Sequence, residues 1–161
     1  METLIVPAGG KKEIYEVITP QIKSIVSGET DAVANMANVA AILKEAFDFF
    51  WIGFYVVKED NSTHGSSLVL GPFQGPLACT RIAFGKGVCG ASWREKATLV
   101  VPDVEKFPGH IACSSLSRSE IVVPLIKNGE VTAVLDIDSK ELSSFDETDA
   151  VSLEAIVKVL I

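Results

Sequence analysis

The segment from Phe107 to Glu120 gathers side chains that are able to carry out thiol chemistry. Its cysteine, Cys113, is surrounded by glycine and serine residues, and His110 and Arg118 are close to it in the sequence. A segment of this kind between strand-like runs is typical of a loop, and loops on a rigid scaffold often carry function. The alternative is a surface loop with an incidental thiol. The choice depends on whether the chain also supplies a pocket, a second cysteine and a suitable charge pattern.

Two further cysteines, Cys79 and Cys89, bring the total in the sequence to three. An odd number favours a reducing compartment over a disulfide framework. Because the chain has only two histidines and no Cys-x-x-Cys motif, a structural zinc site is not expected. Cys89 and Cys113 lie in glycine- or serine-flanked turns, where solvent access is expected, and paired thiols suit redox cycling through sulfenic acid to disulfide. A free cysteine is more often a small buried hydrophobe, so both interpretations stay open.

Three carboxylates are predicted to meet on one face of a sheet. Asp136 and Asp138 are two residues apart on a predicted strand, so both point to the same face. Glu120 opens the neighbouring predicted strand with the same parity. Converging acids repel one another, so at least one tends to keep its proton, and such a cluster suits a ligand's ammonium group or a proton donor near neutral pH. The alternative is solvated strand ends, but acids are depleted from strands, which favours function.

Two aromatic residues, Trp51 and Tyr55, lie four residues apart on the first predicted strand and so share one face. Their rings could form the wall of a pocket and contact a cation or a sulfonium-like centre. Core packing explains the same pattern equally well.

The glycine-rich run Gly85-Lys-Gly-Val-Cys-Gly90 matches the dinucleotide fingerprint G-x-G-x-x-G, with Glu105 about 20 residues further on. The fingerprint belongs to parallel βαβ units, whereas hairpin signals surround this run. We therefore expect the glycines to shape a tight turn beside a pocket and do not expect nucleotide binding.

The hydrophobic pattern predicts the elements that position these residues. Helices are expected over 12–26, where Pro20 can kink or divide the helix, and over 31–47, with Asp31 as the N-cap. A polar turn is expected over 58–67, a tight turn at 74–76, and a hairpin turn at Asn128–Gly129. The β-branched and aromatic residues predict strands over 49–57, 68–73, 77–84, 99–101, 121–127 and 131–139.

Two further helices complete the prediction. A short one is expected over 91–96, and the last begins near Ser144, whose spacing to Glu147 suits a capping box. The apolar residues of that last helix recur at helical spacing and are expected to form its buried face: Leu153, Ile156, Val157 and Leu160. Helices combined with a largely antiparallel sheet predict an α+β fold.

Composition narrows the classes of function. The 161 residues fit a single domain, 1–161, and 48% hydrophobic content indicates a compact core. A net charge of −7 without any basic run disfavours nucleic-acid binding and a membrane-surface role. Neither a transmembrane run nor a signal peptide is evident, so we expect a cytoplasmic protein.

Taken together, these residues resemble free methionine-(R)-sulfoxide reductase, a stand-alone enzyme family with the GAF-domain fold. The resemblance covers nearly the whole chain. Its most specific segments are 51–55 (WIGFY), 70–75 (LGPFQG), 85–90 (GKGVCG), 109–113 (GHIAC), 119–122 (SEIV) and 134–139 (VLDIDS), together with the spacing of the three cysteines.

The resemblance implies a six-stranded antiparallel sheet with helices on one face and the ligand pocket on the other. It also implies a homodimer that reduces free methionine (R)-sulfoxide by sulfenic acid and disulfide chemistry, with no bound cofactor or metal and a thioredoxin-like dithiol as reductant. The roles that it implies are Cys113 as nucleophile, Cys79 as the main candidate for the resolving thiol, Cys89 as the third family cysteine, Glu120 and Asp138 as acids, Glu120, Asp136 and Asp138 as ligands of the substrate ammonium, and Trp51 and Tyr55 as the pocket wall.

A non-enzymatic GAF module that binds a small ligand as a sensor is the alternative function. Sensor domains are usually joined to an output domain, for which 161 residues leave no room, and their pockets do not need three thiols together with three acids.

Overall fold

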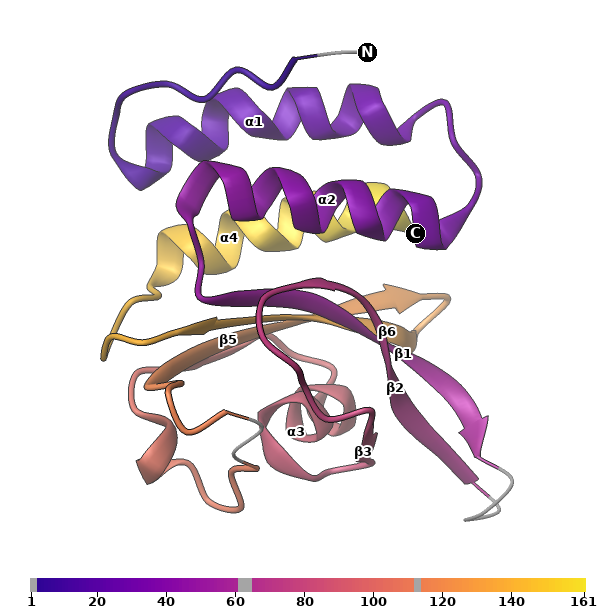
Figure 1. Cartoon of the computed structure of the whole chain (residues 1–161). Helices are drawn as coiled ribbons and strands as arrows, with labels where there is room; N and C mark the ends of the chain where they lie inside the picture. Colours follow the sequence, from indigo (N-terminus) through magenta and orange to yellow (C-terminus); the bar gives the residue numbers. More distant parts are fainter. Residues whose placement is uncertain (1–2, 61–64, 112–113) are drawn as a thin grey trace.

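The computed structural model describes residues 3–60, 65–111 and 114–161 and has an α+β architecture. Its six strands form one antiparallel sheet in the order β3-β2-β1-β6-β5-β4. Helices α2 and α4 cover one face of the sheet, α1 packs on those two helices, and α3 lies against the opposite face (Figure 1). The elements are α1 (Lys11–Val26), α2 (Ala32–Phe47), β1 (Trp51–Asp60), β2 (Gly65–Gln74), β3 (Arg81–Ala83), α3 (Gly87–Glu95), β4 (Leu99–Val101), β5 (Ser119–Lys127), β6 (Glu130–Ser139) and α4 (Glu147–Val157), with short 3-10 helices at Val104–Lys106 and Lys158–Leu160.

The first two helices follow the hydrophobic pattern. Helix α1 runs without a break through Pro20, so this proline does not divide the segment. Asp31 caps α2 as predicted, because its carboxylate accepts a hydrogen bond from the backbone N–H of Ala34 at 2.9 Å. In the part of the chain that the structure describes, no helix combines the length and the apolar character that crossing a membrane requires.

The start of α4 differs from the prediction. Asp146, and not Ser144, is the N-cap, and it forms a capping box with Asp149 in which each carboxylate accepts a backbone N–H of the other residue. The Ser144 hydroxyl instead donates to Ser139 Oγ at 2.7 Å. The Asp149 carboxylate also pairs with Lys11, which ties the start of α1 to this cap. An ion pair from a distant element therefore selected the capping residue.

Two strand boundaries also differ from the prediction. The first two strands pair up to Asp60 and Gly65, so residues 58–60 and 65–67 of the polar stretch belong to strands, and residues 61–64, where a turn was also expected, lie outside the described residues. Backbone pairing does not need apolar side chains, which explains why composition missed it. Conversely, β3 contains only Arg81–Ala83, and its pairing with β2 confirms the hairpin but not the tight turn at 74–76.

The hairpin between β5 and β6 is confirmed. Asn128 and Gly129 both have positive φ, 54° and 80°, as the two-residue type I′ turn requires. From this turn the two strands pair back to Glu120 and Asp138, and an irregularity between Leu125 and Ile126 shifts the register by one residue so that these two acids lie opposite each other.

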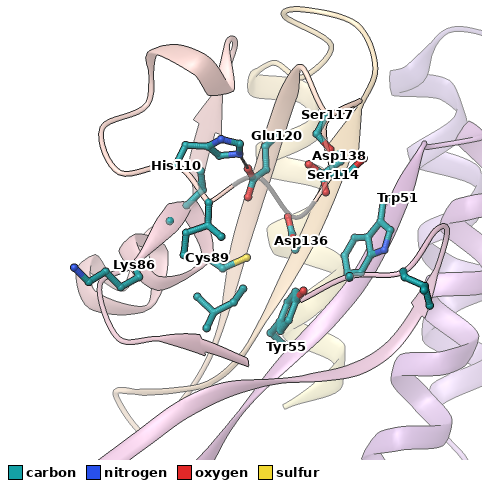
Figure 2. Close-up of a pocket in the computed structure, with 16 residues that line it drawn as sticks. Trp51, Tyr55, Lys86, Cys89, His110, Ser114, Ser117, Glu120, Asp136 and Asp138 are labelled. Carbon is teal, nitrogen blue, oxygen red and sulfur yellow. Dashed lines mark ion pairs between the residues drawn. The ribbon is translucent and has the colours of Figure 1, made fainter. Parts of the chain in front are cut away.

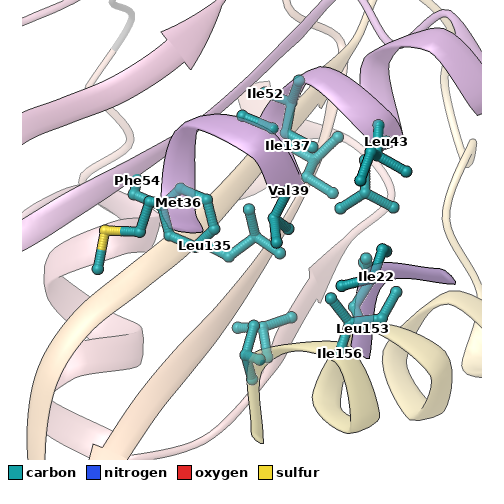
Figure 3. Close-up of a cluster of buried hydrophobic side chains, with 14 of the residues drawn as sticks. Ile22, Met36, Val39, Leu43, Ile52, Phe54, Leu135, Ile137, Leu153 and Ile156 are labelled. Carbon is teal, nitrogen blue, oxygen red and sulfur yellow. The ribbon is translucent and has the colours of Figure 1, made fainter. Parts of the chain in front are cut away.

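Alternating residues on the central strands divide the core in two. Ile52, Phe54, Leu135 and Ile137 point toward the helices and pack with residues such as Leu43 (Figure 3). Their neighbours in the strands, including Trp51, Tyr55, Val122 and Val134, point to the opposite face and form a second buried cluster. The helix-covered face thus supplies a rigid apolar base, and the other face is free to carry polar side chains.

Candidate functional site

A recess that is partly open to solvent lies on the face of the sheet that α1, α2 and α4 leave uncovered. Its walls come from β1, β5 and β6, from the start of α3, and from the loop segments around Leu77 and His110 (Figure 2). This arrangement confirms the predicted placement of helices on one face and a pocket on the other.

The three predicted acids meet in this recess. In the backbone pairing of β5 with β6, Glu120 lies directly opposite Asp138. Asp136 lies on the same face of β6, two residues earlier. On the other side of β6, Asp138 pairs with Trp51 and Asp136 with Gly53 of β1. Two central strand pairings therefore fix the positions of the three carboxylates, and the acids are not solvated strand ends.

Burial and mutual repulsion raise the pKa values of these acids. Burial, followed by Asp136 and Asp138, raises the pKa of Glu120 well above its usual 4.5. Burial and the neighbouring Asp138 also raise the pKa of Asp136 well above 3.8. Burial raises the pKa of Asp138 to about 6, although a hydrogen bond with Ser117 opposes the rise. The raised pKa values favour the protonated, uncharged form of these carboxyl groups, which is the form that a proton donor needs.

One acceptor in the cluster is unsatisfied. The Oδ1 atom of Asp136 is buried and has no hydrogen-bond partner among the described residues. A buried unpaired acceptor is costly, and in native proteins it calls for an explanation such as a ligand. The recess therefore offers a ready position for a cationic or hydrogen-bond-donating group.

Cys89 differs from its predicted setting. It lies in the first turn of α3, which begins at Gly87 and not at residue 91, and its side chain is only 3% exposed. Burial, followed by Asp136 and Glu120, raises the pKa of its thiol well above 9. The prediction of a solvent-accessible thiol in a turn is wrong, although Cys89 does line the recess.

The other two cysteines belong to the loop segments. Cys79 is half-buried between β2 and β3 and is disulfide-bonded, whereas Cys89 is a free thiol. The predicted nucleophile, Cys113, lies outside the described residues.

The aromatic pair has two structural roles. The rings of Trp51 and Tyr55 stack with their centroids 6.0 Å apart and line the recess, as predicted for a pocket wall. Trp51 Nε1 also donates to the backbone oxygen of Pro76 at 3.0 Å, and the Tyr55 hydroxyl donates to that of Cys79 at 2.9 Å. The same two side chains therefore hold the Cys79 segment against the sheet, a role that sequence reasoning missed.

The segment 107–120 contributes two serines to the recess in addition to His110 and Glu120. His110 Nε2 lies 3.8 Å from Glu120 Oε2, and burial lowers the pKa of this imidazole, which favours its neutral form. Ser114 and Ser117 also line the recess, whereas Arg118 does not and serves through its backbone. Their only signal in the sequence was proximity to the cysteine.

The glycine-rich run forms the turn that we expected. Gly85 and Gly87 have φ values of 74° and 61°, and the chain then enters α3 beside the recess. A Cβ atom on Gly90 would lie 2.7 Å from the backbone oxygen of Ala83, so glycine is required there. The sheet of the described chain is antiparallel throughout, which is the wrong context for the dinucleotide fingerprint.

Comparison with known proteins agrees with this geometry. The family profile described as GAF domain matches residues 29–159. The chain belongs to the GAF-domain family. It is 57% identical to GAF domain-containing protein A of Dictyostelium discoideum over 99% of this chain and 98% of the relative. It is also 41% identical to the free methionine-R-sulfoxide reductase of Saccharomyces cerevisiae, over 93% of this chain and 85% of that enzyme.

A solved structure gives the same family assignment. The X-ray structure of free methionine-R-sulfoxide reductase from Neisseria meningitidis, in complex with its substrate, superimposes with a TM-score of 0.94. It is 57% identical to this protein and covers 99% of this chain and 93% of that one. Within the GAF-domain family, the chain therefore belongs with the free methionine-R-sulfoxide reductases.

Proposed function

We propose that this protein is an enzyme that reduces free L-methionine (R)-S-oxide to methionine. The observation that carries the proposal is the convergence of Glu120, Asp136 and Asp138, with raised pKa values, in one recess with an aromatic wall and a cysteine-bearing loop. Two similar proteins named as free methionine-R-sulfoxide reductases, one in complex with its substrate, support it. We further propose that residues 1–161 act as one domain.

The recess suits a zwitterionic amino acid. The ammonium group would contact the acids, where Asp136 Oδ1 has an unused acceptor position. The carboxylate would lie near the start of α3, because Gly87, Val88 and Cys89 line the recess and no side chain caps this helix. The methyl and sulfur end would lie against Trp51 and Tyr55.

The proposed chemistry uses two thiols and a proton donor. The thiol of Cys113 attacks the sulfoxide sulfur while a carboxyl of Glu120 or Asp138 protonates its oxygen. Transfer of that oxygen to the cysteine sulfur releases methionine and leaves a sulfenic acid. The Cys79 thiol then displaces the oxygen as water and forms a disulfide with Cys113, so sulfur in the enzyme is oxidised as the sulfoxide is reduced.

Three observations support Cys79 over Cys89 as the resolving thiol. Cys79 is disulfide-bonded and half-buried. Cys89, in contrast, is a buried free thiol on α3, next to the acids of the sheet. Tyr55 fixes the backbone of Cys79 beside the recess. A thiol with the strongly raised pKa of Cys89 supplies little thiolate, which is the nucleophilic form.

A thioredoxin-like dithiol protein is proposed as the reductant, with no bound prosthetic group. Leu77, two residues from Cys79, has a 90% exposed side chain at the edge of the recess, where such a partner would approach the disulfide. Leu77→Asp should therefore slow turnover with a protein dithiol more than with dithiothreitol. Val33→Asp at the exposed start of α2, on the far side of the sheet, is the matched control and should change neither rate. Equal slowing with both reductants would contradict this site of approach.

The proposal includes a cytoplasmic homodimer. The reducing environment follows from a reaction that requires reduced thiols between turnovers. The exposed apolar side chain of Val151 on α4 is available for self-association. Light scattering at micromolar concentration should give the mass of two chains, and a monomer would contradict this part of the proposal.

The decisive assay separates the two sulfoxide epimers. Methionine release from pure R and pure S sulfoxide is measured with dithiothreitol, using the wild-type chain and Cys113→Ser. Turnover of the R epimer alone, abolished in the variant, is the expected result. If neither epimer reacts, the enzyme proposal fails and a ligand-binding sensor function takes its place.

A further inference from the structure

The sulfur of Cys89 and the carboxylates of Glu120 and Asp136 come close together at the base of the recess. One ligand atom from each residue lies within 4.8 Å of the other two, and the three side chains are only 3%, 6% and 7% exposed. Figure 2 shows these side chains pointing toward a common space. The thiol–carboxylate cluster, defined here as these three residues, was not predicted from the sequence as a unit.

A second observation, a buried oxygen without a hydrogen-bond partner, points to a ligand at the cluster. Asp136 Oδ1 is buried and has no hydrogen-bond partner in the described chain. If no ligand bound at the cluster, this oxygen would have lost its hydrogen bonds to water on folding without gaining others, which costs free energy of folding. A bound cation would satisfy it.

The donor set selects the kind of cation. One thiolate and two carboxylates suit Zn²⁺, whereas Mg²⁺ and Ca²⁺ take six or more oxygen ligands. With Zn–S of about 2.3 Å and Zn–O of about 2.0–2.2 Å, the ligand atoms of a tetrahedral site lie about 3.3–3.8 Å apart. The three ligand atoms, which all lie within 4.8 Å of one another, can therefore reach this geometry with at most a small rotation of their side chains.

The three ligands are held on rigid elements. Cys89 lies on α3, Glu120 on β5 and Asp136 on β6, and α3 packs directly on both strands. Ligands preorganised on separate packed elements lose little freedom on binding a metal ion. Three protein ligands also leave the fourth tetrahedral position to water.

We propose that Cys89, Glu120 and Asp136 form a binding site for a thiophilic divalent cation, represented by Zn²⁺, and that the bound ion excludes the amino-acid substrate. The competition rests on the proposed function, which places the substrate ammonium at the same Asp136 oxygen. Binding involves no redox change. The cation displaces the thiol proton of Cys89 and any carboxyl protons, which pass to the buffer.

The test isolates the Cys89 thiol. The sequence has three cysteines, so the variant Cys79→Ser/Cys113→Ser retains Cys89 alone. Co²⁺ titration of this variant should produce thiolate-to-metal charge-transfer absorption with one ion per chain, and Zn²⁺ should displace it. In the same background, Cys89→Ser should abolish the absorption, while Glu141→Gln, at an exposed acid outside the cluster, should leave it unchanged.

A second variant tests the carboxylate without removing the thiol. Loss of outer-shell partners of metal ligands already weakens affinity about 10–100-fold, so loss of a direct ligand in Asp136→Asn should weaken Zn²⁺ binding by about 100-fold or more. Circular dichroism verifies that each variant is folded. No charge-transfer absorption in the Cys89-only protein, or Zn²⁺ affinity in Asp136→Asn within about two-fold of its parent, would overturn the site.

Substrate competition is measured separately. In the Cys79→Ser/Cys113→Ser variant, which cannot turn over, methionine (R)-sulfoxide should raise the apparent dissociation constant for Zn²⁺ as its concentration increases. Zn²⁺ binding to this variant that is independent of sulfoxide would refute the exclusion of substrate. Because metal binding is read without turnover, a chain that binds Zn²⁺ but reduces neither epimer would contradict the proposed function and leave the metal site standing.

Discussion

Replacing Asp138 with asparagine should make the protein more stable at pH 8 while removing its proposed activity. Asp138 lies in the acid cluster, paired with Glu120 across the β5–β6 ladder. Asparagine has nearly the same shape and its side-chain oxygen can still accept the hydrogen bond of Ser117. The substitution therefore removes the charge and little else, so the pH dependence of its effect reports the cost of ionising this site.

The magnitude follows from the pKa. Burial raises the pKa of Asp138 from 3.8 to about 6. A raised folded-state pKa lets the folded chain hold a proton that the unfolded chain releases between these values, so stability falls as the pH rises through this window. At 1.36 kcal/mol per pH unit, the full penalty above pH 6 is about 3 kcal/mol, and partial solvent exposure reduces it to about 2 kcal/mol.

Urea unfolding at pH 8 and pH 4, with a chelator present, measures this effect. Asp138→Asn should raise the free energy of unfolding by about 2–3 kcal/mol at pH 8 and change it little at pH 4, because the wild-type group is protonated in the folded state there. Relief of repulsion on Glu120 and Asp136 acts in the same direction. Glu141→Gln, at an exposed acid, is the matched control and should show no such dependence.

The reasoning would be refuted by either of two results. A variant that is less stable than wild type at pH 8 would show that the Asp138 charge supports the fold. An equal change at both pH values would show that the effect comes from packing or hydrogen bonding and not from ionisation.

Three further predictions concern the scaffold. Tyr55→Phe removes the hydrogen bond to the Cys79 carbonyl, so it should lower the free energy of unfolding in urea by about 1 kcal/mol. It should also speed alkylation of the reduced Cys79 thiol, and an unchanged alkylation rate would contradict the anchoring role of Tyr55. Asp146→Ala should lower the unfolding free energy by about 1–2 kcal/mol, which is more than the effect of Ser144→Ala. A larger effect of Ser144→Ala would show that Ser144 is the N-cap of α4, as the sequence predicted. Leu153→Ala, at a fully buried position, should cost about 2–5 kcal/mol and lower the thermal midpoint without changing substrate specificity; a cost below about 1 kcal/mol would refute its place in the core.

The sequence predicted the helices and the central hairpin well because their signals are local. Asp31 can cap a helix through its own neighbours, and Asn128–Gly129 can adopt positive φ without help from other elements. The predicted element boundaries were wrong where a residue distant in the sequence, or backbone pairing, determined where an element begins or ends. Lys11 selected the capping box of α4, and backbone pairing extended β1 and β2 through polar residues.

Part of the site was also within reach of the sequence. Strand parity alone placed Asp136 and Asp138 on one face and Trp51 with Tyr55 on one face, and the structure has both pairs lining the recess. Parity cannot show which strands are neighbours. The pairing of β1 with β6 placed the aromatic residues beside the acids.

The residue types and their alternation along each strand therefore determined which side chains could do chemistry and which face would hold them. Tertiary structure decided how these groups behave. Packing of α3 on β5 and β6 buried Cys89 against the acids, which raised the pKa of its thiol and made a predicted surface cysteine part of a buried cluster. Asp136 Oδ1, in the same cluster, has no hydrogen-bond partner among the described residues. Desolvation and pairing depend on contacts between segments far apart in the chain, so no local pattern could have predicted them.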